Sequence, residues 1–177
     1  MVIPDFLPLK EAEELSRLFL QGEYERKKQG SRSVFKGWGN GLPGGDEIYT
    51  AAFWRSRKIE SALGSVAGKF RKLFGEVDLR AHKMGPGDHF RCHVDERVGE
   101  MGFTLTLSRD WKWDWGGLLM VMEDGVPVPH LPRFNELVVI EGQPHFVTQV
   151  SPWAKEPRLT LVGFGKGFIE ACSTGWN

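Results

Sequence analysis

The sequence has few cysteines, no excess of charge of either sign and no long hydrophobic run. Its only cysteines, Cys92 and Cys172, are too few for a disulfide framework. The longest uncharged run, Gly142 to Ala154, contains a histidine and is far shorter than a membrane span. Acidic side chains near the amino terminus interrupt the apolar stretch that a signal peptide would need. These features predict a cytoplasmic protein without a membrane segment.

The charge balance also bears on the partners. The chain has 23 lysines and arginines against 23 aspartates and glutamates, so its formal net charge is zero. Because nucleic-acid-binding domains usually carry an excess of basic residues, a nucleic acid partner is not expected. A small-molecule or peptide substrate fits this composition better, and no oligomeric state is predicted.

A chain of 177 residues suits a single globular domain with one main core. Apolar residues recur at helical spacing from Lys10 to Leu20 and again from Ser56 to Phe74, where Gly75 follows as a stop signal. We therefore expect a helical amino-terminal support over about residues 1–76. The remainder, about residues 77–170, is expected to form the catalytic β core.

Residues 24–45 lie between the two expected helices and are basic at first and then rich in glycine. This composition is typical of an irregular loop. The ordinary interpretation is a solvated connector. The functional interpretation is a lid that closes over a substrate, because long loops inside compact domains often serve function.

From Val77 onward the pattern changes to short β-rich segments separated by glycine and proline. Seven strands are expected, over residues 77–84, 89–95, 102–108, 116–123, 136–142, 145–150 and 158–165. With the helices first and the strands afterwards, this pattern predicts a mainly β protein with flanking helices, built on a sandwich or barrel.

Within the second of these segments, His93 and Asp95 form a His-x-Asp triplet. Chance alone would give about 0.2 such triplets in this composition, so the triplet by itself proves little. On a strand, however, residues two apart point to the same face. An Fe(II) centre that activates dioxygen needs two imidazoles and one carboxylate on one face. His145, which opens a later strand, is the best candidate for the second imidazole.

The other histidines are less suitable, because His82 and His89 lie upstream and His130 lies in a proline-rich loop. Arg158 opens the last expected strand, where its neighbours are apolar or small. A buried arginine needs a carboxylate partner, since an unpaired buried charge is very costly. A dicarboxylate co-substrate would supply one, and the planar guanidinium binds a carboxylate through two parallel hydrogen bonds.

These residues and their surroundings resemble the Fe(II)- and 2-oxoglutarate-dependent oxygenases of the prolyl 4-hydroxylase-like group. The resemblance spans about residues 77–168 and rests on HVD, LSRDW, WGGLL, RFNELVVIEG, HFVTQV and PRLTLVGF. The segment PDFLPLKEAEEL is similar to the opening helix of that group. The order of the His-x-Asp triplet, the distal histidine and then the arginine is much more specific than any one of these pieces.

What the resemblance implies is a double-stranded β-helix, a jelly-roll core of the cupin type. It implies His93, Asp95 and His145 as catalytic residues and Fe(II) ligands, with Arg158 binding the far carboxylate of 2-oxoglutarate. Dioxygen would be the second co-substrate, and ascorbate an optional reductant. The reaction implied is hydroxylation of a C–H bond in peptidyl proline, a free amino acid or another small metabolite, with succinate and CO2 as co-products.

The sequence departs from many members of the group at two positions. Lys83 stands ten residues before the first ligand histidine, where relatives carry a tyrosine that reaches the co-substrate, and Thr106 stands where others have a tyrosine on the following strand. Both side chains can form hydrogen bonds, so we expect them to bind the co-substrate, with ordinary strand positions as the alternative. A cupin-like metal-binding protein and a catalytically silent interaction domain are the alternative functions.

Overall fold

The structure is a computed structural model that describes residues 1–31, 49–95 and 101–167. Antiparallel strands dominate it. They are β1 (Val2–Ile3), β2 (Glu25–Ser31), β3 (Tyr49–Arg55), β4 (Val77–Met84), β5 (His89–His93), β6 (Met101–Thr106), β7 (Leu119–Glu123), β8 (Val126–His130), β9 (Leu137–Ile140), β10 (His145–Val147) and β11 (Arg158–Gly165). In the described residues these strands form one sheet in the order β1-β9-β6-β11-β4-β3-β5-β10-β7-β8, with β2 paired to β3.

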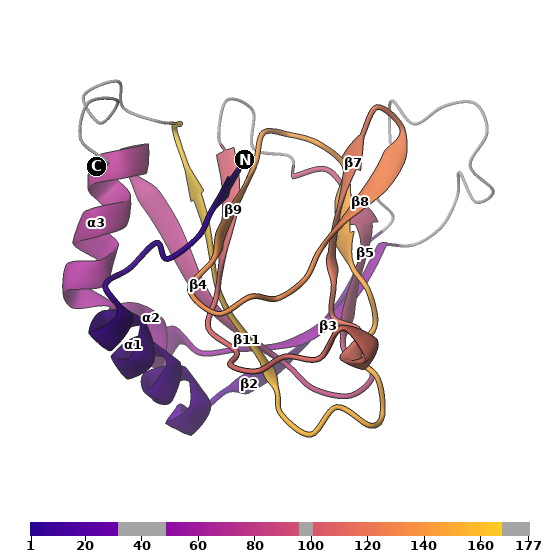
Figure 1. Cartoon of the computed structure of the whole chain (residues 1–177), viewed down its shortest axis with the longest axis horizontal. Coiled ribbons are helices and arrows are strands. Elements are labelled where there is room, and N and C mark those ends of the chain that lie inside the picture. Colours follow the sequence, from indigo (N-terminus) through magenta and orange to yellow (C-terminus); the bar gives the residue numbers. More distant parts are fainter. Residues whose placement is uncertain (32–48, 96–100, 168–177) are drawn as a thin grey trace.

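The sheet folds back on itself into an open barrel. The strands from β1 to β4 in that order form one wall, and those from β5 to β8 form the other (Figure 1). Strand β3 joins the walls, because Trp54 and Arg55 pair with β4 while Ala51 and Ala52 pair with β5. This arrangement is consistent with the double-stranded β-helix that the family resemblance implied.

Helices cover the outer side of the first wall (Figure 1). They are α1 (Leu9–Gln21), α2 (Arg57–Ser61) and α3 (Gly64–Phe74), and a short 3-10 helix, η1 (Trp113–Trp115), lies at the second wall. The sequence predicted one helix from Ser56 to Phe74, but the structure has two. Gly64 adopts a φ of +39°, which glycine tolerates and which interrupts a regular helix.

The largest apolar core lies between these helices and the first wall. Phe103 of β6 stacks on Phe70 and Phe74 of α3, with ring centroids 4.9 and 4.4 Å apart. Gly163 of β11 makes this contact possible, because a Cβ there would lie 2.2 Å from a ring atom of Phe103. Leu161 of β11 is fully buried in the same cluster. The helices thus hold the first wall in place through a contact surface that is mainly apolar.

Four strands differ from the sequence prediction, and the first of them, β1, lies in the part that was expected to be helical. Residues 25–31 form β2 where an irregular segment was expected from 24 to 45, and residues 32–45 of that expected loop lie outside the described residues. Strand β3 precedes residue 77 and yet joins the central sheet. His130, expected in a loop, ends the edge strand β8, whose prolines are tolerated because one side of an edge strand needs no partner.

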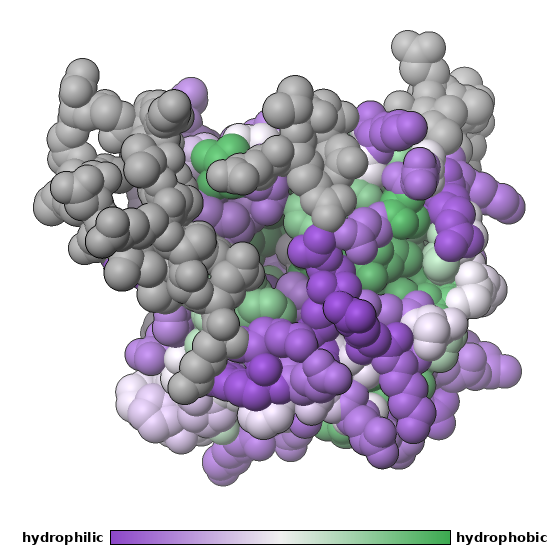
Figure 2. All heavy atoms as spheres, turned by 180° about the vertical axis from the view of Figure 1, so that it is seen from behind, coloured by the Kyte–Doolittle hydropathy of each residue, from purple (hydrophilic) through white to green (hydrophobic). Residues whose placement is uncertain are grey.

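The surface agrees with the balanced composition. Seen from behind, the coloured residues are mostly hydrophilic, and hydrophobic side chains gather in a patch on the right of the view (Figure 2). Among the described residues, no helix has the length and apolar content needed to cross a membrane.

Candidate metal centre

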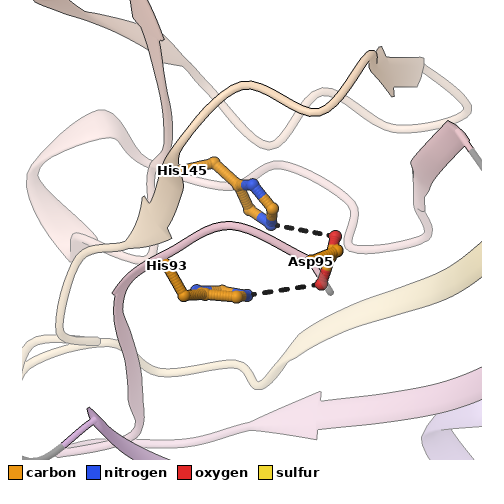
Figure 3. Close-up of side chains that lie close together, drawn as sticks. All are labelled: His93, Asp95 and His145. Carbon is orange, nitrogen blue, oxygen red and sulfur yellow. Dashed lines mark ion pairs between the residues drawn. The ribbon is translucent and has the colours of Figure 1, made fainter. Parts of the chain in front are cut away.

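His93, Asp95 and His145 come together inside the barrel on the second wall. His93 ends β5 and His145 opens β10, and the two residues are direct partners in the antiparallel pairing. Asp95 follows two residues after His93 and faces both rings (Figure 3). Its two carboxylate oxygens lie 3.7 Å from Nε2 of His93 and 3.5 Å from Nε2 of His145. One donor atom from each side chain lies within 4.8 Å of the others, which suits a single metal ion.

A β-bulge in β5 helps to aim His93. Between the pairs His145 with His93 and Val147 with Phe90, strand β5 has one more residue than β10. Bulges of this kind bend a strand and redirect its side chains, often next to active sites. As a result the rings of Phe90 and His93 neighbour each other, with centroids 6.4 Å apart.

Both histidines present the same ring nitrogen to the centre. Nδ1 of His93 donates to the carbonyl of Arg91 at 2.8 Å, and Nδ1 of His145 donates to the carbonyl of Gln143 at 2.9 Å. With its proton on Nδ1, each neutral imidazole keeps a lone pair on Nε2 for a metal. Burial and the neighbouring His145 ring lower the pKa of His93, which favours the neutral form that a metal requires.

Gly102 of β6, on the facing wall, leaves room for the carboxylate. A Cβ at this position would lie 3.2 Å from Oδ2 of Asp95, which is tighter than ordinary van der Waals contact. The space beside Asp95 therefore depends on the absence of a side chain at residue 102.

Arg158 opens β11 and lies in the barrel interior with 3% of its surface exposed. Its Nη1 donates to Oγ1 of Thr160 at 3.3 Å and contacts Sδ of Met84 at 3.7 Å, while its Nε has no partner. Within the described part of the chain no carboxylate pairs with it. Burial lowers the pKa of Arg158 to about 10, but the guanidinium still carries its charge at neutral pH. Such a group fits an anionic ligand.

The structure separates the other two predicted residues. Thr106 of β6 is buried and pairs with Thr160, so it lies on the interior face beside the contacts of Arg158. Lys83 lies on the opposite face of β4 from Met84, and its Nζ sits 5.3 Å from the ring centre of Tyr24. Because alternate residues of a strand point to opposite faces, Lys83 lies on the side of β4 away from Arg158, and its contact with the co-substrate stays a prediction.

Sequence reasoning missed two residues of this interior. His82 is the neighbour of Lys83 on β4 and is 6% exposed, and Thr160 of β11 pairs with it directly. The signal that could have found His82 is strand alternation. Only one of Lys83 and His82 can share a face with Arg158, and the pairing register decides which.

Comparison with known proteins agrees with this geometry. The sequence profile of the 2OG-Fe(II) oxygenase superfamily matches residues 79–166. No curated protein matches the chain. Among solved structures, a prolyl-4-hydroxylase from Pseudomonas putida is 19% identical, with a TM-score of 0.61 over 93% of this chain and 90% of that chain.

Two further structures share the fold. One is a prolyl hydroxylase from Trichoplax adhaerens in complex with a hypoxia inducible factor peptide fragment, which is 18% identical with a TM-score of 0.57 over 99% of this chain and 87% of that chain. The other is HygX from Streptomyces hygroscopicus with nickel, 2-oxoglutarate and hygromycin B bound, which is 10% identical with a TM-score of 0.59 over 93% and 82%. At these identities the likeness is one of fold. The profile match and the His-Asp-His cluster together show that residues 79–166 form a 2OG-Fe(II) oxygenase domain, so the protein is a 2-oxoglutarate-dependent dioxygenase.

Proposed function

We propose that the protein is a hydroxylase whose Fe(II) ion is bound by Nε2 of His93, Nε2 of His145 and the carboxylate of Asp95. Two imidazoles and one carboxylate are the donor set that non-haem Fe(II) oxygenases use, with further coordination positions left for co-substrate and gas. The fixed Nδ1 hydrogen bonds support this assignment, because they hold both rings with Nε2 toward the carboxylate.

Arg158 is the proposed binding residue for the distal carboxylate of 2-oxoglutarate. The observation that carries this proposal is its buried guanidinium, which has no carboxylate partner in the described residues. A carboxylate bound there would neutralise the charge and accept a hydrogen bond from the unpartnered Nε. Thr160 already fixes one side of the guanidinium, and Thr106 lies next to Thr160.

Held by these three residues, Fe(II) would supply the chemistry that couples the reduction of dioxygen to the conversion of 2-oxoglutarate into succinate and CO2, with one oxygen atom going to the substrate and the other to succinate. The chain's own residues bind and orient the reactants and exclude water. The apolar cluster of Leu119, Val121, Val138 and Ile140 brings β7 and β9 together across the interior and helps to exclude water from it.

The proposed substrate is a C–H bond of peptidyl proline, a free amino acid or another small metabolite. The structures of similar fold support this range, since one holds a peptide fragment and another holds hygromycin B. Nothing in the charge of the chain favours nucleic acid, because its acidic and basic residues balance.

The test is succinate formation by the Fe(II)-loaded protein, screened with proline peptides, free amino acids and related metabolites. We expect 2-oxoglutarate to be converted to succinate, with the fastest conversion and a hydroxylated product for the true substrate class. The variant His145→Ala serves as the control for metal-dependent turnover. Metal binding without any succinate would instead support a cupin-like metal protein, and binding of neither metal nor 2-oxoglutarate would support a silent interaction domain.

A further inference from the structure

His82 is a buried polar residue that the roles described above leave unused. It is 6% exposed, and its Nε2 has no hydrogen-bond partner within the described residues. The ring packs between aromatic side chains, with centroids 4.6 Å from Phe53 and 5.8 Å from Phe90. A phenylalanine would fill this space equally well without an unpaired nitrogen, which costs free energy when it is buried. The nitrogen therefore requires an explanation.

The pairing register places His82 beside the residues that surround Arg158. Thr160 of β11 lies directly between His82 of β4 and Thr106 of β6. Arg158 precedes Thr160 by two residues and so shares its face. His82 and Arg158 are thus diagonal neighbours on the interior face, at a separation of about 7 Å, which side chains of their length bridge through a shared ligand.

The ring of His82 is also close to the metal centre, with one aromatic side chain between them. Phe90 stacks on His82 at an interplanar angle of 12° and on His93 at 30°. One aromatic ring therefore separates His82 from a proposed iron ligand. A molecule that extends from the iron to Arg158 passes along the wall that includes His82.

Two unpartnered nitrogens on one face specify the chemistry of the missing partner. Nε of Arg158 carries a hydrogen, and the partner that both nitrogens need is an anion with two acceptor atoms, which describes a carboxylate. On this basis, and resting on the proposed binding of 2-oxoglutarate, we propose that Nε2 of His82 donates a hydrogen bond to the distal carboxylate of that co-substrate.

The protonation state of His82 agrees with this role. Burial, together with the positive charges of Arg80, Arg55 and Arg158, lowers its pKa to about 3, so the ring is neutral at physiological pH. A neutral imidazole has one N–H, and the tautomer with the proton on Nε2 is the donor. One arginine and one neutral donor together match the single charge of one carboxylate.

The experiment measures binding without turnover, with Mn(II) in place of Fe(II) in the full chain. Isothermal titration gives the dissociation constants of 2-oxoglutarate and of 2-oxopentanoate, in which a methyl group replaces the distal carboxylate. His82→Phe preserves the ring packing and removes the donor. We expect this variant to bind 2-oxoglutarate about tenfold more weakly or worse, because a hydrogen bond to a charged group is lost. Its affinities for 2-oxopentanoate and for Mn(II) should stay as in the unmodified protein.

His82→Gln is the rescue variant, because its amide nitrogen reaches the position of Nε2, whereas the amide of His82→Asn reaches only the position of Nδ1. We expect the glutamine variant to recover most of the affinity for 2-oxoglutarate. If the phenylalanine variant fails to fold, the glutamine and asparagine variants are compared, and glutamine should bind 2-oxoglutarate several-fold more tightly, again without a difference for 2-oxopentanoate.

Unchanged 2-oxoglutarate affinity in His82→Phe, or an equal loss for both ligands, would overturn the role of His82. Equal affinities of the glutamine and asparagine variants would do the same. These outcomes leave the proposed function standing, since the unmodified protein still binds 2-oxoglutarate. If the unmodified protein binds no 2-oxoglutarate, the proposed function fails, and the inference about His82 fails with it.

Discussion

The two faces of strand β4 differ in character, although their residues alternate along one segment. Leu79 and Ala81 pack toward the helices, in a cluster of apolar side chains. His82 and Met84 point to the barrel interior, where His82 and Arg158 have buried nitrogens without partners. Apolar packing is complete in the protein alone, whereas buried polar groups need partners. The difference indicates that the helix-facing side stabilises the fold and that the interior is completed by ligands.

The largest effect is expected when a proposed iron ligand is removed from the interior, which should abolish ligand binding and leave the fold stable. His145→Ala should raise the dissociation constant for Fe(II) by more than about 100-fold, because even residues that only orient metal ligands contribute 10- to 100-fold. Succinate formation should be lost, while the melting temperature of the metal-free protein changes little. His130→Ala, at the edge strand β8, is the matched histidine control. Full turnover in His145→Ala would refute the assignment.

Arg158→Met tests the interior without touching the metal ligands. Removing one partner of a buried charged pair costs several kcal/mol, so 2-oxoglutarate should bind about 100-fold more weakly or worse. The ligand-free protein should keep or raise its melting temperature, because an unpaired buried charge has been replaced by an apolar side chain of similar length. Calorimetry of binding and thermal unfolding measure the two effects. A destabilised protein with normal 2-oxoglutarate affinity would show that Arg158 serves the fold instead.

A substitution on the helix-facing side should lower the stability of the fold and leave ligand affinity unchanged. Phe103→Ala removes a ring that is 1% exposed and stacks on two phenylalanines of α3. The cavity should lower the free energy of unfolding by about 3–5 kcal/mol, as measured by urea denaturation. Well below the unfolding transition, the affinities for metal and 2-oxoglutarate should remain near those of the unmodified protein. A selective loss of ligand affinity with normal stability would contradict the division between the two faces.

The smallest effect concerns acid stability. The folded pKa of His82, about 3, is far below that of an exposed histidine, so below pH 6.5 the unfolded chain binds a proton that folded His82 does not. The stability present at neutral pH is therefore lost as the pH falls, by about 1 kcal/mol per pH unit from this residue. Between about pH 7 and pH 5.5, His82→Phe should lose about 1 kcal/mol less than the unmodified protein in urea unfolding. An identical loss in both proteins would show that His82 is not held neutral by burial.

The structure agrees with several predictions from local pattern. Helix α1 follows the apolar spacing from Lys10 to Leu20, because one buried stripe per turn is visible in the sequence itself. Each of the seven expected strands overlaps a strand of the structure, for the same reason of short-range alternation. Strand β3 was not predicted, since its place between β4 and β5 depends on partners distant in sequence. The break between α2 and α3 depends on one glycine conformation that the helical pattern conceals.

The sequence by itself determined the identity of the candidate metal ligands, because His93 and Asp95 are close in the chain and His145 opens a recognisable strand. The tertiary structure alone decided how these side chains meet, through the pairing of His93 with His145 and the bulge in β5. It also decided that His82, and not Lys83, shares the interior with Arg158. A one-residue change of register exchanges the two faces of a strand, and register is set by contacts between strands that no local pattern contains.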